Sequence, residues 1–213
     1  MRVLIVEDQA MMRDVLRRAC ERDFGCELAG VCATGAETLA QLDAAAADLI
    51  LLDLQLPDWD GLDLLDALRA RQPGLRILVL SSRCDRLAVY RIDRAHISGF
   101  IDKGSQTVEL LGSALAAIAA GGVYFSPVFL AERLKRRNDP TSFDKVLSDR
   151  EQTVLLCLAG CLDDRQIGLK LGISAETAEK HRFNLMRKLD LRSVPEILRY
   201  ARAQGFAAGH PPS

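Results

Sequence analysis

The sequence lacks an apolar segment long enough to cross a membrane. A spanning helix needs about 18 or more largely uncharged apolar residues in a row. The longest candidate, around residues 110–120, is rich in alanine and too short. The first residues lead directly into an apolar run, without the basic segment and cleavage site that mark a secretory signal. We therefore expect a cytoplasmic protein that does not interact with a membrane.

Closely paired cysteines are also missing. None of the six cysteines belongs to a Cys-x-x-Cys motif. Cys157 and Cys161 lie four residues apart on an expected helix, but no second pair of ligands follows them. A structural zinc site normally needs two such pairs. We interpret the cysteines as reduced thiols packed among apolar side chains.

The chain has almost no net charge, at −1 for 213 residues, but its charges are unevenly distributed. Residues 1–104 carry 13 basic and 17 acidic side chains, whereas residues 147–213 carry 10 basic and 8 acidic ones. Five basic side chains and a single acidic one lie within residues 180–192. This asymmetry is typical of a domain for phosphate chemistry joined to a nucleic-acid-binding domain, although a solvated helix face has the same composition.

The first 120 residues alternate between short apolar runs and helical patterns. The expected strands are Val3–Val6, Glu27–Val31, Leu49–Leu52, Ile77–Leu80 and Gly99–Asp102. The expected helices are residues 10–22, 35–46, 61–71, 86–95 and 107–120. Apolar runs of this length are typical of buried parallel strands, and five such units predict a doubly wound (βα)5 domain. We place this domain at residues 1–121.

The rest of the chain has no strand pattern. Residues 122–146 are interpreted as a linker with a short helix, and residues 147–206 as an all-α domain of four helices at 149–160, 164–171, 175–189 and 194–204. Ser148 with Glu151, and Ser193 with Glu196, have the spacing of capping boxes. The short turn Gly172-Ile173-Ser174 between the second and third helices predicts a helix-turn-helix. Residues 207–213 form a tail.

Three carboxylates follow the ends of two expected strands. Glu7 and Asp8 end the first strand, and Asp53 ends the third. Because the carboxyl ends of parallel strands form the ligand crevice of such a sheet, we expect these groups to converge. Their mutual repulsion favours a bound cation, and oxygen ligands suit Mg²⁺. A carboxylate beside Mg²⁺ can act as a nucleophile in phosphoryl transfer.

The chain resembles a known family over nearly its whole length. Residues 1–121 are similar to a response-regulator receiver domain, and residues 147–206 to a LuxR-type helix-turn-helix, a combination found in response regulators of the NarL/FixJ group. The residues that carry the likeness include Glu7-Asp8, Asp53 and the loop Pro57-Asp-Trp-Asp-Gly61. Lys103 also matches, although Gly104 stands where the family usually has proline.

The resemblance implies a role for each residue at the strand ends. Asp53 would accept a phosphoryl group from a sensor histidine kinase. Mg²⁺ would be bound by Asp8, Asp53 and the main-chain carbonyl of Gln55, with Glu7 completing the acidic pocket. Ser81 and Lys103 would stabilise the negative charge of the transferred group. Ser81 and Phe100 occupy the family's switch positions. Gln55 and Arg83 lie at positions that tune the lifetime of the phosphoryl group.

An enzymatic alternative uses the same nucleophile. Phosphatases that resemble haloacid dehalogenases also have an aspartate at a strand end, but a second aspartate two residues later acts as a general acid. Gln55 occupies that position here. A glutamine cannot protonate the leaving group, so the sequence favours a regulator over an enzyme.

The helix at 175–189 is the expected recognition helix. Ala178, Leu185 and Leu189 give it an inward stripe, and His181 is interpreted as a packed residue on the same side. The outer side and the family positions supply the expected DNA contacts. These contacts are Thr177, Glu179, Lys180, Phe183, Arg187 and Lys188. Glutamate can accept a hydrogen bond from cytosine, and phenylalanine can contact a thymine methyl group.

The last expected helix, at 194–204, has an apolar side formed by Ile197, Leu198 and Ala201. In the family this helix dimerises the output domains, so the resemblance implies a homodimer when the protein is phosphorylated. The same side could instead only close the four-helix core. We predict a phosphorylation-dependent DNA-binding transcriptional regulator. The alternative is a phospho-signalling module whose helix-turn-helix binds protein rather than double-stranded DNA.

Overall fold

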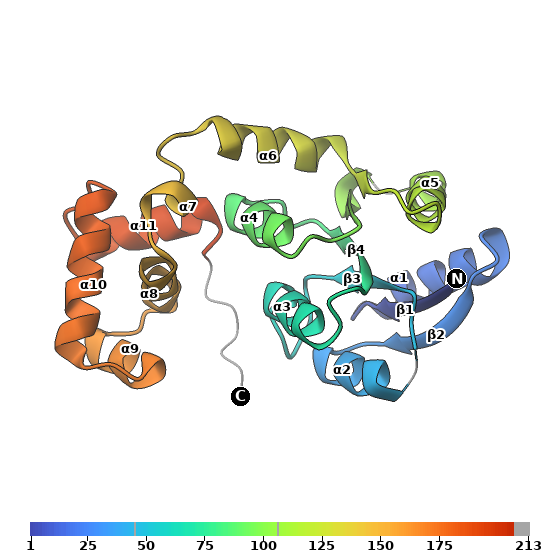
Figure 1. Cartoon of the computed structure of the whole chain (residues 1–213), viewed down its shortest axis with the longest axis horizontal. Coiled ribbons are helices and arrows are strands. Elements are labelled where there is room, and N and C mark those ends of the chain that lie inside the picture. Colours follow the sequence, from blue (N-terminus) through green and yellow to red (C-terminus); the bar gives the residue numbers. More distant parts are fainter. Residues whose placement is uncertain (45, 106, 207–213) are drawn as a thin grey trace. The chain divides into compact units, whose positions relative to one another are not determined.

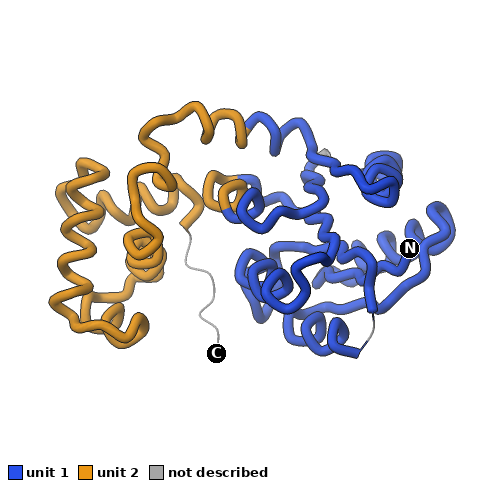
Figure 2. Tube along the Cα trace, in the orientation of Figure 1, with its two compact units in different colours: residues 1–84, 91–131, 212–213 blue, residues 85–90, 132–211 orange. Residues whose placement is uncertain are grey.

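A computed structural model describes residues 1–44, 46–105 and 107–206, and its chain forms two compact units. Of the described residues, those within 1–84 and 91–131 make up the first unit, and those within 85–90 and 132–206 make up the second (Figure 2). The expected tail at 207–213 lies outside the described residues. Within the described part of the chain, none of the helices has both the length and the apolar character needed to span a bilayer.

The first unit is built on a parallel sheet of six strands in the order β2-β1-β3-β4-β5-β6 (Figure 1). The strands are β1 (Arg2–Val6), β2 (Glu27–Cys32), β3 (Leu49–Asp53), β4 (Arg76–Ser81), β5 (Gly99–Asp102) and β6 (Tyr124–Phe125). The helices of this part of the chain are α1 (Ala10–Arg18), α2 (Gly35–Ala44), α3 (Gly61–Arg71), α4 (Arg86–Arg94) and α5 (Val108–Ala119). The predicted doubly wound α/β fold is confirmed.

The central strands are buried on both faces, which explains their continuous apolar runs. On one face, Val3, Leu49 and Leu78 join a core cluster with Leu16 of α1 and Leu115 of α5. The alternate strand positions are equally buried, and α2 and α3 lie on the opposite side of the sheet (Figure 1). Because these strands are parallel, the carboxyl ends of β1, β3, β4 and β5 all lie along one edge of the sheet.

The sixth strand was not predicted. Tyr124 donates its N–H to the carbonyl of Ser98, and Ser126 donates to that of Phe100. These bonds add two residues of the expected linker to the edge of the sheet beside β5. A two-residue strand is too short to show an apolar alternation, so only pairing with β5 defines it.

Two helical predictions also needed correction. The first helix does not continue to residue 22 as a regular α-helix, because residues Ala19–Asp23 form a π-helical turn (η1) in which Phe24 donates to Ala19. The linker was expected to contain one short helix, but it contains two helices, of which the first is long. It holds α6 (Pro127–Asn138), which has 12 residues, and α7 (Phe143–Val146). A short 3-10 turn (η2, Lys103–Ser105) follows β5.

The second unit contains the four expected helices of the C-terminal domain. They are α8 (Asp149–Ala159), α9 (Asp164–Leu171), α10 (Ala175–Lys188) and α11 (Val194–Gln204). The capping box of Ser148 and Glu151 is present. The one at Ser193 is not, because Glu196 accepts the N–H of Arg192 and Ser193 makes no side-chain cap. A glutamate at this spacing can accept the main-chain N–H of either Ser193 or Arg192, so the spacing alone does not predict which bond forms.

The turn between α9 and α10 requires glycine at two places. Gly172 has a left-handed φ of 65°, and this conformation ends α9. A Cβ on Gly168 would lie 2.8 Å from the carbonyl oxygen of Ile173. Without these glycines α9 and the start of α10 could not come so close. The helix-turn-helix geometry is therefore specified by backbone constraints that the sequence displays.

Candidate functional site

Asp53 is the centre of the site at the sheet edge. It is the last residue of β3, and its side chain is buried. Its Oδ2 accepts a hydrogen bond from Lys103 Nζ at 2.8 Å, and its Oδ1 accepts the main-chain N–H of Gln55 at 3.0 Å. Lys103 follows β5, which is separated from β3 only by β4. The register of the parallel strands thus brings together two residues that are 50 positions apart.

The acidic pair at the end of β1 completes the cluster. Carboxylate oxygens of Glu7, Asp8 and Asp53 all lie within 4.8 Å of one another, close enough to share a metal ion. Glu7 is fully buried and Asp8 is exposed, so a cation could reach these carboxylates from the solvent. Lys103 Nζ also donates to Glu7 at 2.8 Å. Three anions and one cation leave a net negative charge, which favours a divalent cation such as Mg²⁺.

The same arrangement changes the pKa of two groups. Burial raises the pKa of Glu7 above its usual value, and the nearby charge of Asp53 raises it further against the opposing hydrogen bond from Lys103. Burial alone would lower the pKa of Lys103, but its hydrogen bonds to Asp53 and Glu7 outweigh that effect and raise it. Lys103 therefore stays positively charged in the pocket.

Sequence reasoning missed a residue that anchors the acidic pair. Arg13 of α1 donates from Nη1 to the main-chain carbonyls of Glu7 at 2.8 Å and Asp8 at 3.0 Å. These bonds hold the loop after β1 in place. The available signal was weak, because a single arginine one turn into a helix is common. Only the fold shows that its side chain turns back onto the loop.

Ser81 lies where the resemblance expected it, at the end of β4. It is buried, and its Oγ accepts the N–H of Arg83 at 3.0 Å. The Arg83 guanidinium forms an ion pair with Asp60 at 3.1 Å, and Asp60 also caps α3 by accepting the N–H of Leu62. The side chain of Arg83 is thus engaged with the loop after β3. This contact to Asp60 was not predicted from the sequence.

The loop after β3 approaches its own strand closely. A Cβ on Gly61 would lie 2.2 Å from the Cα of Leu54, so no other residue fits there without movement of the backbone. Asp58 of the same loop accepts the N–H groups of Gly35 and Ala36, at the start of α2. These contacts explain why the sequence has an acidic, glycine-containing loop directly after Asp53.

Phe100 of β5 is completely buried, and its ring is in contact with a second aromatic side chain. The ring centroid of Phe129 in α6 lies 4.9 Å away, and that of Phe125 in β6 lies 5.1 Å from Phe129. Phe100, the expected switch residue, is therefore packed against the first turn of α6. The sequence did not predict this stack.

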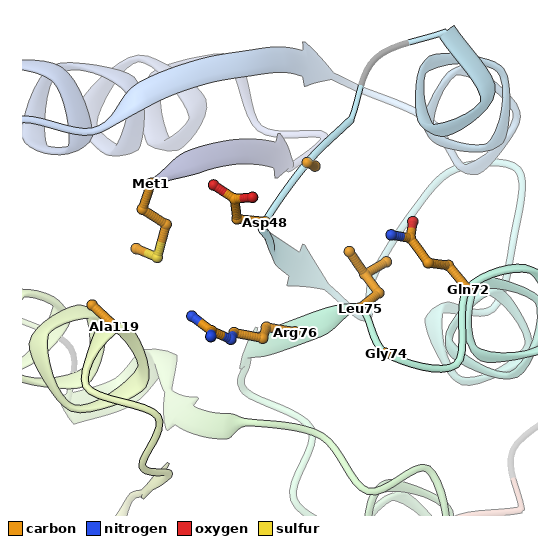
Figure 3. Close-up of a pocket in the computed structure, with 8 residues that line it drawn as sticks. Met1, Asp48, Gln72, Gly74, Leu75, Arg76 and Ala119 are labelled. Carbon is orange, nitrogen blue, oxygen red and sulfur yellow. The ribbon is translucent and has the colours of Figure 1, made fainter.

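A surface pocket of about 370 Å³ lies at the opposite edge of the sheet (Figure 3). Asp48 and Arg76 stand on either side of it, next to the amino ends of β3 and β4. The Asp48 carboxylate accepts the N–H of Arg2 at 2.7 Å. Because this pocket is a strand length away from Asp53, it is separate from the carboxylate cluster.

The outer face of α10 presents most of the expected DNA contacts. Lys180, Glu179, Phe183 and Arg187 are exposed, whereas Leu185 is buried. Their spacing places them along one side of the helix. Thr177 is only half-exposed, and its hydroxyl lies 2.8 Å from that of Ser174, which caps the helix by accepting the N–H of Thr177.

Lys188 differs from the other members of the expected set. Its Nζ lies 2.7 Å from Oε2 of Glu151, a buried carboxylate on α8. Burial alone would raise the pKa of Glu151, but hydrogen bonds from Lys188 and Ser148 lower this pKa below its usual value. This pair connects the C-terminal end of α10 to the buried side of α8. A contact of Lys188 with DNA would have to compete with it.

Comparison with known proteins assigns both parts of the chain to families. The family described as the response regulator receiver domain matches residues 3–114, and that described as bacterial regulatory proteins of the luxR family matches residues 145–201. These ranges include the carboxylate cluster and α10, respectively. The expected resemblance is therefore confirmed for both domains.

Two curated relatives match this chain over most of their length. The nitrate/nitrite response regulator protein NarP of Escherichia coli (strain K12) is 36% identical over 196 residues, covering 90% of this chain and 89% of NarP. A nitrate/nitrite response regulator protein homolog of Haemophilus influenzae is 32% identical, covering 91% and 92%. The fold is similar to that of RcsB from Salmonella enterica serovar Typhimurium bound to a promoter, with a TM-score of 0.67, 23% identity and coverage of 95% and 98%.

Proposed function

This chain belongs to the NarL/FixJ group of two-component response regulators, and we propose that phosphorylation of Asp53 controls its binding to DNA. As a member of this group it is a transcription regulator and not an enzyme. We assign the receiver domain to residues 1–121, the linker to 122–146 and the DNA-binding domain to 147–206. We propose that the protein acts in the cytoplasm and that a sensor histidine kinase is its phosphoryl donor.

The observation that carries the proposal is the buried Asp53 carboxylate, bonded to Lys103 and set beside Glu7 and Asp8. In the proposed reaction an Asp53 oxygen forms a bond to phosphorus while the phosphorus–nitrogen bond to the kinase histidine breaks, and the electron pair leaves on that nitrogen. Lys103 is already positioned to balance the negative charge of the transferred group. The buried Ser81 hydroxyl would donate to a phosphoryl oxygen.

The residues present fit a divalent cation. The oxygens of Glu7, Asp8 and Asp53 lie within 4.8 Å of one another, and carboxylate and carbonyl oxygens are the ligands that Mg²⁺ prefers. We propose that Asp8, Asp53 and the main-chain carbonyl of Gln55 would hold it, with Glu7 in the surrounding pocket. When bound, Mg²⁺ would neutralise charge that develops on the phosphoryl oxygens.

A labelling experiment tests the acceptor. The full-length protein, incubated with Mg²⁺ and labelled acetyl phosphate, should become phosphorylated, and Asp53→Asn should abolish the label. Asp48→Asn is a matched control, because it makes the same change just before the opposite end of β3, at an exposed carboxylate. Full labelling of Asp53→Asn would show that another residue is the acceptor.

We propose that α10 lies in the major groove of double-stranded DNA. Thr177, Lys180 and Arg187 would position the helix on the phosphates, while Glu179 and Phe183 would contact base edges. A homodimer formed on phosphorylation would read two half-sites related by two-fold symmetry.

Selection of bound duplexes from a random pool with the phosphorylated full-length protein tests this proposal. Recovery of a palindromic site whose affinity falls steeply with salt is the expected result. Recovery of no preferred duplex would favour a helix-turn-helix that binds protein.

A further inference from the structure

Phe183 is a large apolar side chain in the middle of a polar helix face. The residue is 57% exposed, while its neighbours on the outer side of α10 are charged or amide residues. These neighbours are Glu179, Lys180, Asn184 and Arg187. Much of this residue's surface therefore remains in contact with water. Exposure by itself does not identify a role, because single surface apolar residues are common.

A second feature fixes the orientation of this ring. The guanidinium carbon of Arg182 lies 5.0 Å from the centroid of the Phe183 ring, within the range of a cation–π contact. Arg182 is held in turn by Asp164 of α9, which accepts from Nε at 3.0 Å and from Nη2 at 2.8 Å. Two helices therefore cooperate to hold one exposed ring.

Arg182 is also less available than the other cations of α10. Its side chain is 17% exposed, compared with 72% for Lys180, and a second acid, Glu179, lies 3.6 Å from Nη2. A guanidinium that is engaged by a carboxylate fork loses much of its ability to bind a phosphate. The charge of Arg182 is used inside the protein.

We propose that Phe183 reads the C5-methyl group of a thymine and that Arg182, held by Asp164, is the positioning residue for its ring. This inference rests on the proposed DNA binding of α10. A phenyl ring offers no hydrogen bond to a base edge, and the thymine methyl is the apolar feature of the major groove. A ring that is already fixed loses little conformational freedom on binding, so the contact becomes selective.

Replacement of thymine by deoxyuridine isolates this methyl group. Each thymine of the selected duplex is replaced in turn, and binding to the phosphorylated full-length protein is measured. One thymine in each half-site should show an affinity loss of about fourfold, which corresponds to ~0.8 kcal/mol for one methyl-sized apolar group at 1.4 kcal/mol per tenfold. In Phe183→Ala the ratio of the affinity for the thymine duplex to the affinity for the uracil duplex should fall close to one.

Two variants test the positioning role. Arg182→Lys keeps the charge but loses the planar fork, and Asp164→Asn removes its ionic partner from the neighbouring helix. Both should lower the ratio of the affinity for the thymine duplex to that for the uracil duplex, and in Arg182→Lys the salt dependence of binding should stay the same. Arg202→Lys, at an exposed position on α11, is the matched control and should retain the ratio.

The outcomes separate this inference from the function on which it depends. Failure to select any duplex refutes DNA binding, and the inference with it. A tightly bound duplex that is insensitive to uracil at every thymine refutes the methyl contact alone. If Arg182→Lys and Asp164→Asn both keep the wild-type ratio of thymine-duplex to uracil-duplex affinity, Arg182 does not position the ring. A salt slope that becomes shallower by about one in Arg182→Gln would identify a phosphate contact instead.

Discussion

Removal of the Lys188 ammonium should destabilise the DNA-binding domain. In Lys188→Met the apolar stem is kept, but the buried Glu151 carboxylate loses a partner at 2.7 Å and retains the N–H and hydroxyl of Ser148 among the described residues. Breaking a fully buried ion pair costs about 3–5 kcal/mol. Lys188 is 37% exposed, so water can partly replace it, and a charge-assisted hydrogen bond of ~2 kcal/mol is the better guide.

Urea unfolding followed by far-UV circular dichroism measures this loss. A decrease of ~2 kcal/mol corresponds to a roughly 30-fold smaller folded-to-unfolded ratio. Lys170→Met, at an exposed lysine of α9, is the matched control and should change the stability by less than about 0.5 kcal/mol. If Lys188→Met left the stability unchanged and instead made the salt slope of DNA binding shallower by about one, Lys188 would be a phosphate contact and the reasoning from the ion pair would be wrong.

Four further outcomes are expected. Folding lowers the pKa of Glu151, so the stability that this carboxylate contributes is present above its usual pKa of 4.5 and is lost as the pH falls through the folded pKa. The difference in unfolding free energy between wild type and Lys188→Met, measured in urea titrations, should therefore become smaller below about pH 4.5. Ser81→Ala should still be labelled by acetyl phosphate yet lose phosphorylation-dependent dimerisation in size-exclusion chromatography, and an unchanged response would argue against its switch role. Lys180→Ala should weaken binding to every duplex alike and reduce the salt slope by about one, since the residue is exposed beside the proposed groove. Gly61→Ala should destabilise the receiver by more than about 2 kcal/mol in thermal unfolding, because a Cβ there meets backbone at 2.2 Å; an unchanged melting temperature would contradict the close approach.

Local patterns were sufficient for most of the fold and for the location of the proposed acceptor. Buried parallel strands appear as apolar runs, and the residue after such a run must lie at the carboxyl edge, so Asp53 and the Glu7-Asp8 pair could be located without a structure. The cap at Ser148 was equally readable, because its partner Glu151 lies three residues away. Each of these features depends on residues that are close in sequence or on the regular geometry of a strand.

Features that depend on long-range contacts could not be derived in this way. The β6 strand exists only because β5 offers it hydrogen bonds, and Phe129 meets Phe100 only because the first turn of α6 follows β6. The sequence shows Arg182 and Lys188 simply as members of a basic stripe.

The sequence by itself determined the order of the domains, the residue types at the sheet edge and the helix that is proposed to face DNA, because these follow from local periodicity and residue type. The tertiary structure alone decided which charges are available. Asp164 engages Arg182, and Glu151 engages Lys188, from positions 18 and 37 residues away. The free energy of a charge depends on the partner and the water around it, and both are set by how the helices pack.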